Sequence, residues 1–212
     1  MALTVVTPSA QPYLTTAQTV LEQLGLSGAK VEWLIKAATH AAERFTGRIF
    51  ARQTYDETVA GYGDALIELT NTPVVSITSV TSRGTVVTDY ILENAQAGWL
   101  YRAAAWGTTE RRRATFGTNW ATPEGFADPL TTVRYVGGYL MPGQTGRDLP
   151  YDLEQFALLC VQEWYGSLTR DATVSSISLG GDSISYSSGG ESTALGLSNR
   201  AIGLLMPWRR FV

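Results

Sequence analysis

The sequence predicts an α+β protein with a helical core, an inserted antiparallel β region and an extended C-terminal arm. Two segments, 28–46 and 151–168, repeat apolar residues at helical spacing. Between them, at about 49–139, short strand-like runs alternate with glycine-containing turns. The arm, residues 172–212, opens with a serine-rich stretch that has no lysine or arginine. We therefore expect residues 1–171 to form the core domain, with the β region inserted in it.

Two helices are predicted before the β region. A short helix spans residues 14–24, and a longer one spans residues 28–46. Residues that favour helix ends flank both segments: Thr15 or Thr16 and Gly25 for the first, and Ser27 and Gly47 for the second.

The two long helices each carry one apolar face. In the segment 28–46 it consists of Val31, Leu34, Ile35, Ala38, Ala42 and Phe45. In the segment 151–168 it consists of Leu153, Phe156, Ala157, Cys160, Trp164 and Leu168. We expect these faces to pack against each other, with Phe45 and Trp164 buried between the helices.

The β region is predicted to form a small antiparallel sandwich or open barrel. Its strand-like runs are 54–59, 65–69, 74–80, 85–88, 90–92, 99–101 and 132–136. Such short strands with turn residues between them are typical of antiparallel sheets.

The arm is predicted to dock on another chain. Residues 177–186 alternate apolar and polar residues around a Gly-Gly-Asp turn, which predicts a hairpin with one apolar face. A flexible joint at 187–190 and a short helix at about 197–206 follow. Because a hairpin cannot bury its apolar face alone, the arm either folds back on its own domain or docks elsewhere. The charge-poor linker favours docking, with the arm mobile in the free subunit. The candidate docking residues are its apolar groups and terminal arginines: Ile177, Leu179, Ile184, Tyr186, Ile202, Leu205, Trp208, Arg209, Arg210 and Phe211.

The charge pattern suits assembly better than dedicated nucleic-acid binding. The net charge is −3, whereas nucleic-acid-binding domains are normally basic. Arginine outnumbers lysine 14 to 2, and its planar guanidinium forms bidentate pairs at interfaces. Arg111, Arg112 and Arg113 form a basic run. We expect them to meet acidic groups of an adjacent copy or to line a DNA channel.

A single cysteine and a single histidine leave few designs for an active site. Cys160 lies on the apolar face of a predicted helix, and His40 lies off such a face, one turn from Glu43. The sequence has no Walker loop and no dinucleotide fingerprint. We therefore expect no enzymatic activity, no cofactor and no metal. The longest apolar run, 156–161, is too short for a membrane span, and the N-terminus lacks a signal peptide, so we expect a soluble protein.

Aromatic residues in the β region leave one alternative from another class of function. They are Trp99, Tyr101, Trp106 and Trp120. If several of these rings were exposed on one face, they could stack on sugars or bases. The alternative is therefore a carbohydrate-binding module.

A series of short motifs runs from about Leu14 to the end of the chain. The motifs are Ala41–Arg48, Ile67–Leu69 with Pro73–Val80, Asp89–Leu92 with Gly98–Tyr101, Val133–Tyr139, Leu149–Leu153 and Leu205–Arg210. In this order and spacing they resemble the head–tail connector (adaptor) proteins of tailed bacteriophages. The large β insertion and the Arg111–Arg113 run match no motif of that family.

The resemblance implies a structural virion protein. Such adaptors form a ring, typically a dodecamer, below the portal at the head–tail neck. The ring extends the DNA channel and offers a docking surface to the stopper or tail-completion protein, and a C-terminal arm reaches toward the portal. The implied partners are further copies of the chain, the portal, the next neck protein and packaged DNA, with assembly in the host cytoplasm. A stopper or tail-completion protein is the alternative within the same class.

Overall fold

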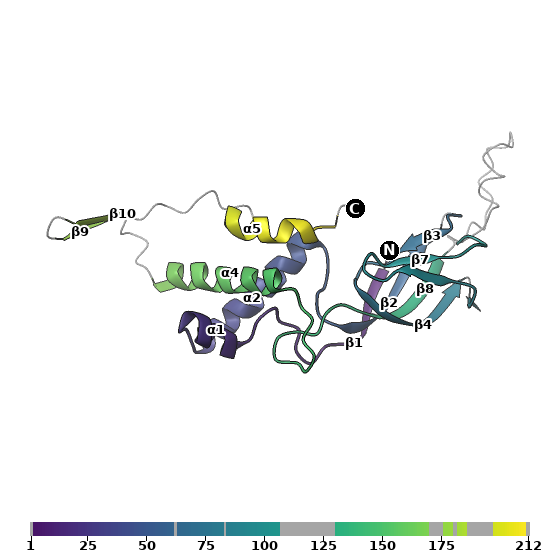
Figure 1. The fold of residues 1–212 in the computed structure, drawn as a ribbon, viewed down its shortest axis with the longest axis horizontal. Coiled ribbons are helices and arrows are strands. Elements are labelled where there is room, and N and C mark those ends of the chain that lie inside the picture. The colour runs from purple at the N-terminus through teal and green to yellow at the C-terminus, as the bar shows by residue number, and fades with distance from the viewer. Residues whose placement is uncertain are drawn as a thin grey trace, which may run out of the picture. The chain divides into compact units, whose positions relative to one another are not determined.

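The structure, a computed structural model, divides into two compact units (Figure 1). It describes residues 2–61, 63–82, 84–106, 130–169 and 197–210, and the backbone of the strands 176–179 and 182–185. Residues 1–12 and 50–139 form the β unit, and residues 13–49 and 140–212 form the helical unit. Helices and antiparallel sheets are thus largely segregated along the chain, and the predicted α+β class is confirmed.

The helices of the helical unit lie close to their predicted positions. They are α1 (Ala17–Leu24), α2 (Ala29–Thr46), α4 (Tyr151–Thr169) and α5 (Asn199–Leu205), with a 3-10 turn η1 (Met206–Trp208) after α5. Gly47 ends α2 in the left-handed conformation, as predicted, and its N–H donates to Glu43 O at 2.9 Å. The prediction of Ser27 as N-cap is wrong, because Gly28 takes that position with a φ of 103° and α2 starts after it.

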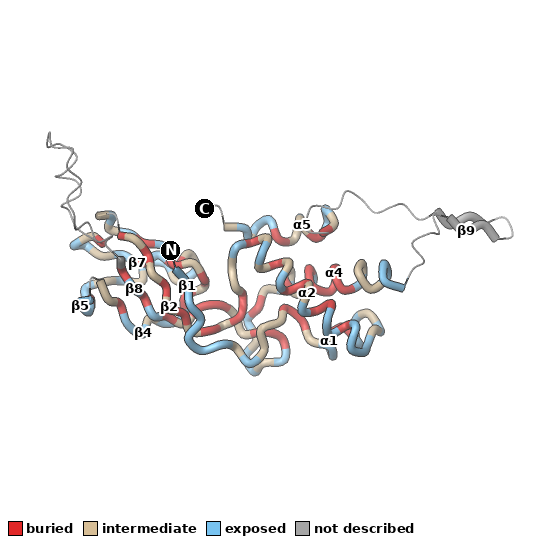
Figure 2. The backbone as a smooth tube through the Cα atoms, turned by 180° about the vertical axis from the view of Figure 1, so that it is seen from behind, coloured by how far each residue is buried: buried red, intermediate tan, exposed pale blue. Residues whose placement is uncertain are grey.

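The predicted packing of α2 against α4 is confirmed. One buried cluster joins α1, α2 and α4 through Val20, Val31, Leu34, Ile35, Leu158 and Val161. Figure 2 shows buried residues along much of α4. Because α4 is buried on more than one side between Leu153 and Val161, it must have packing partners besides α2.

Two predicted core residues are only half-buried. Phe45 and Trp164 are both of intermediate exposure, so their predicted burial between the helices is wrong. Thr46, beside Phe45, is buried instead and satisfies its hydroxyl by donating to Ala42 O at 2.8 Å. Leu168, predicted on the buried face, is 56% exposed near the C-terminal end of α4.

The β unit holds two antiparallel sheets. The larger has the strand order β1-β2-β8-β4-β5, and the smaller has the order β3-β7-β6. The strands are β1 (Ala2–Thr7), β2 (Gln53–Ala60), β3 (Leu66–Glu68), β4 (Val74–Ser82), β5 (Thr85–Val86), β6 (Ile91–Asn94), β7 (Trp99–Tyr101) and β8 (Leu130–Gly137). All the strands predicted in this region are present. Strand β1 was not predicted, because all six of its residues are exposed and show no apolar alternation.

Alternate residues of β2 and β8 face a common core. On β2 the buried residues are Gln53, Tyr55, Glu57 and Val59. The rings of Tyr55 and its register partner Tyr135 on β8 lie 5.5 Å apart between centroids. On the other face, Asp56 accepts two hydrogen bonds from Arg134 at 2.6 and 2.7 Å, and this contact lowers the pKa of Asp56.

The predicted hairpin in the arm is present as a pair of antiparallel strands. They are β9 (Ser176–Leu179) and β10 (Asp182–Ser185), with Ile177 opposite Ile184. This register places both isoleucines on one face of the hairpin, as the sequence alternation predicts.

Candidate interaction surface

The C-terminal segment 197–210 packs on its own helical unit. Leu197, Ala201 and Leu205 have no exposed surface, and their four-residue spacing places them on one side of α5. Helix α5 contacts both α4 and α2. It therefore supplies a further packing partner for α4.

Polar contacts fix this segment at both of its ends. Ser198 caps α5 by accepting from Ala201 N at 3.2 Å, and its hydroxyl donates to Glu163 Oε1 of α4 at 3.0 Å. At the other end, the indole Nε1–H of Trp208 donates to Asp152 Oδ2, in the first turn of α4, at 2.7 Å. The backbone of Arg210 donates to Thr46 O at 3.1 Å. The segment thus runs antiparallel to α4 and ties α4 to the end of α2.

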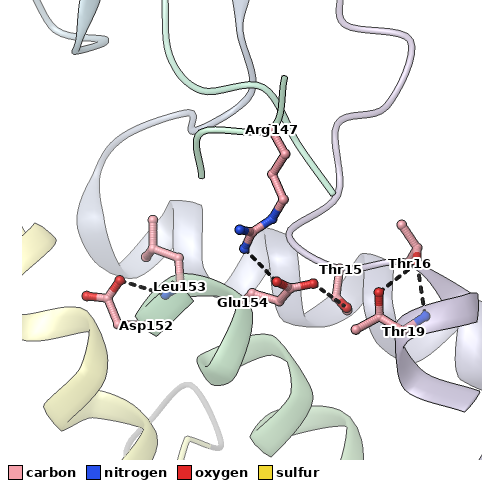
Figure 3. A network of polar contacts seen from close by, with 7 residues as sticks. All are labelled: Thr15, Thr16, Thr19, Arg147, Asp152, Leu153 and Glu154. Carbon is pink, nitrogen blue, oxygen red and sulfur yellow. Dashed lines mark hydrogen bonds and ion pairs between the residues drawn. The ribbon is translucent and has the colours of Figure 1, made fainter. Parts of the chain in front are cut away.

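A second polar network holds the start of α4 in place (Figure 3). Glu154 accepts from Arg147 NH2 at 2.6 Å and from the Thr15 hydroxyl at 3.5 Å. Asp152 accepts from the backbone of Leu153 at 3.0 Å, so its two carboxylate oxygens serve the helix start and Trp208 separately. The carboxylates also lie where the positive end of the α4 dipole favours negative charge. This network positions Asp152 for its contact with the C-terminal segment.

The expectation that the C-terminal end of the arm lacks a place on its own domain is wrong for residues 197–210. Leu205 is a core residue of the helical unit and is not exposed to a partner. Trp208 is half-buried, with its indole N–H used within the chain. Arg209 is exposed, and its guanidinium lies 5.5 Å from the centroid of the Phe45 ring. Ile202 and Arg210 are half-buried.

The remaining predicted site residues lie outside the described side chains. They are Ile177, Leu179, Ile184, Tyr186 and Phe211 of the arm, and Arg111, Arg112 and Arg113 of the β unit. One exposed residue was missed: Met206, which is 45% exposed. The four-residue spacing of Leu197, Ala201 and Leu205 could have identified it, because that spacing leaves residues 202 and 206 on the outer side of the segment.

The aromatic residues of the β region do not form a single exposed platform. Trp106 has no exposed surface, and its Nε1–H donates to Leu100 O at 3.1 Å. Trp99 and Tyr101, two residues apart on β7, are 40% and 37% exposed. Trp120 lies outside the described residues. The carbohydrate-binding alternative therefore loses Trp106, one of the rings on which it depends.

The groups with catalytic potential are separated in the fold. Cys160 is buried, as predicted, whereas His40 is exposed with its Nδ1 3.6 Å from Glu43 Oε2. Among the described residues, no three His, Cys, Asp or Glu side chains are grouped so that they could hold a metal ion. None of the helices within the described ranges is both long and apolar enough to cross a membrane.

The Cys160 thiol should be unreactive in the folded protein. Burial, followed by the nearby Glu163 charge, raises the pKa of Cys160 to about 12. We expect no labelling by a thiol-specific disulfide reagent at pH 8, and labelling of one thiol per chain after denaturation. The thiol stays protonated in the native state while it ionises in the unfolded chain, so its contribution to stability is lost as the pH rises from about 9 to 12. Rapid labelling of the native protein would contradict the buried position.

The fold of the whole chain is similar to that of chains in solved particle structures. Two are described as the neck of an empty gene transfer agent (GTA) particle with C6 symmetry and the neck of a native GTA particle with C12 symmetry. Each matches at 16% sequence identity and a TM-score of 0.59, over 100% of this chain and 97% of that chain. A chain of the native GTA virion matches at 17% identity and a TM-score of 0.58, with the same coverage. No protein-family model and no curated protein matches the sequence. At this level of identity the likeness shows a shared fold.

Proposed function

We propose that the protein is a structural component of a virion neck, a head–tail adaptor that forms a ring below the portal. The observation that carries the proposal is the end-to-end likeness of both units together to chains of particle necks. The order of sequence motifs that resembles the adaptor family supports it independently. In this role the protein acts through its surfaces: it extends the DNA channel and offers a docking site to the stopper or tail-completion protein. A ring requires two different, complementary faces on each copy.

The arm is proposed to contact the portal through fewer residues than the sequence suggested. The hairpin residues Ile177 and Ile184 stay in the proposed contact, together with the exposed Met206 and Arg209 at the end of the chain. Leu205 and Trp208 serve instead to hold the segment on the helical unit. Arginine suits the portal contact because its guanidinium pairs with carboxylates in a bidentate geometry.

Arg111, Arg112 and Arg113 stay a proposal on sequence grounds. Their density in a chain of low charge favours a contact with acidic groups of an adjacent copy or a position in the channel.

The function is tested by removing the gene from the genome that encodes the chain and examining the particles by electron microscopy. We expect DNA-filled heads without tails, and tailed particles again when the intact chain is supplied from a plasmid. Normal numbers of tailed particles without the chain would overturn the proposal. A binding assay with purified proteins separates the two neck roles, because an adaptor binds the portal directly, whereas a stopper binds only when the adaptor is present.

A further inference from the structure

Helix α2 carries an exposed tryptophan opposite its buried face. Trp33 is 63% exposed, whereas Val31 and Leu34 are buried. The positions one or two helical turns from Trp33 hold only small or basic residues: Ala29, Lys30, Lys36, Ala37 and His40. Trp33 and these neighbours, the Trp33 face, combine an apolar centre with both lysines of the chain.

The small sheet of the β unit has an exposed apolar face of the opposite charge. Its register places Leu66, Tyr101 and Ile91 in one row, with Trp99 in the next. These four side chains are between 37% and 64% exposed. Exposed carboxylates lie on or beside the same strands: Asp64, Glu68 and Glu93. Strands β3, β6 and β7 contain no lysine or arginine. We call this surface the Trp99 face.

We propose that the Trp33 face of one copy docks on the Trp99 face of a neighbouring copy. The proposal rests on the proposed ring and names the two surfaces that close it. Exposed aromatic groups provide the central contact, as they do in many interfaces, and the lysines meet carboxylates at its rim. Because each face carries one sign of charge, two Trp33 faces repel each other, and so do two Trp99 faces. The charges therefore favour head-to-tail contacts over two-fold pairs.

Reversing the charge of each face separately gives a direct test on the full chain. An acidic variant carries Lys30→Glu and Lys36→Glu, and a basic variant carries Asp64→Lys and Glu93→Lys. All four positions are exposed, so the substitutions disturb no core contact. Sedimentation velocity, with and without the portal, should show self-association at least about tenfold weaker for each variant alone.

An equimolar mixture of the two variants should assemble like the wild type. In an alternating ring, every acidic Trp33 face meets a basic Trp99 face, and every basic Trp33 face meets an acidic Trp99 face. A misfolded variant could not be rescued in this way, so the mixture separates a lost contact from a lost fold. Glu22→Lys and Arg200→Glu, two exposed charge reversals outside both faces, are the controls and should assemble normally.

A zero-length carbodiimide cross-linker offers a second readout on the wild-type chain. In a mixture of isotope-labelled and unlabelled protein, we expect links from Lys30 or Lys36 to Asp64 or Glu93 between labelled and unlabelled copies. The inference is overturned if these links form only within one chain, if a reversed variant assembles normally, or if mixing restores nothing. In those cases a wild-type ring would leave the proposed function standing. A wild-type chain that stays monomeric with the portal present would overturn both.

Discussion

Replacing Glu57 with alanine should lower the free energy of unfolding of the β unit by about 4 kcal/mol. Glu57 on β2 has no exposed surface. Its carboxylate accepts from the backbone N–H of Thr70 at 2.9 and 3.1 Å, from the Thr70 hydroxyl, and from the Tyr135 hydroxyl at 2.6 Å. The alanine would leave these buried donors without their acceptor and would create a cavity beside them.

The carboxylate also connects the two sheets of the β unit. Thr70 follows β3 of the small sheet, whereas Glu57 and Tyr135 lie on neighbouring strands of the large one. Burial, and then the Glu57 charge, raises the pKa of Tyr135, so its hydroxyl keeps the proton that it donates. The connection therefore persists across the ordinary pH range.

The adjacent carboxylate provides a matched control for this prediction. Asp56→Ala removes an exposed ion pair with Arg134 and should have a much smaller effect, because solvent screens such pairs. Chemical denaturation followed by the fluorescence of the β unit measures both variants. Equal losses for Asp56→Ala and Glu57→Ala would contradict the buried role of Glu57.

Replacing Leu205 with alanine should destabilise the helical unit by about 3 kcal/mol. Leu205 has no exposed surface and anchors α5 within the unit. Its neighbour Met206 is 45% exposed, so Met206→Ala should cost less than about 1 kcal/mol. Circular dichroism during denaturation compares the two variants, which differ by one position in the chain.

Hydrogen exchange on the isolated subunit provides an independent readout. The α5 amides should be protected in the wild type and should exchange much faster in Leu205→Ala, with little change in Met206→Ala. If the wild-type α5 amides exchange as fast as unstructured chain, the packing of residues 197–210 on the helical unit is wrong.

Local sequence patterns predicted most of the individual elements. The apolar periodicity of residues 28–46 and 151–168 predicted α2, α4 and their mutual packing. The alternation around the Gly-Gly-Asp turn predicted the β9–β10 hairpin, and Gly47 marked the end of α2. These signals are readable because helix periodicity, capping and tight turns depend on residues only a few positions apart.

Contacts between distant segments decided the rest. Strand β1 is held by pairing with β2, about fifty residues later, so its own residues carry no buried pattern. Glu57 is buried only because Thr70 and Tyr135 bring donors to it from 13 and 78 positions away.

The placement of the C-terminal segment was decided in the same way. The sequence by itself determined that residues 197–206 are helical and carry apolar groups that need burial. It left open whether those groups fold back or dock elsewhere, because Trp208 and Leu205 have the same composition in either case. The tertiary structure decided it by placing Asp152 of α4 and the carbonyl of Thr46 where the segment's donors reach them, at 2.7 Å for Trp208 and 3.1 Å for Arg210. A polar group is stabilised in the interior only when a partner meets it there, and the position of that partner is a property of the fold.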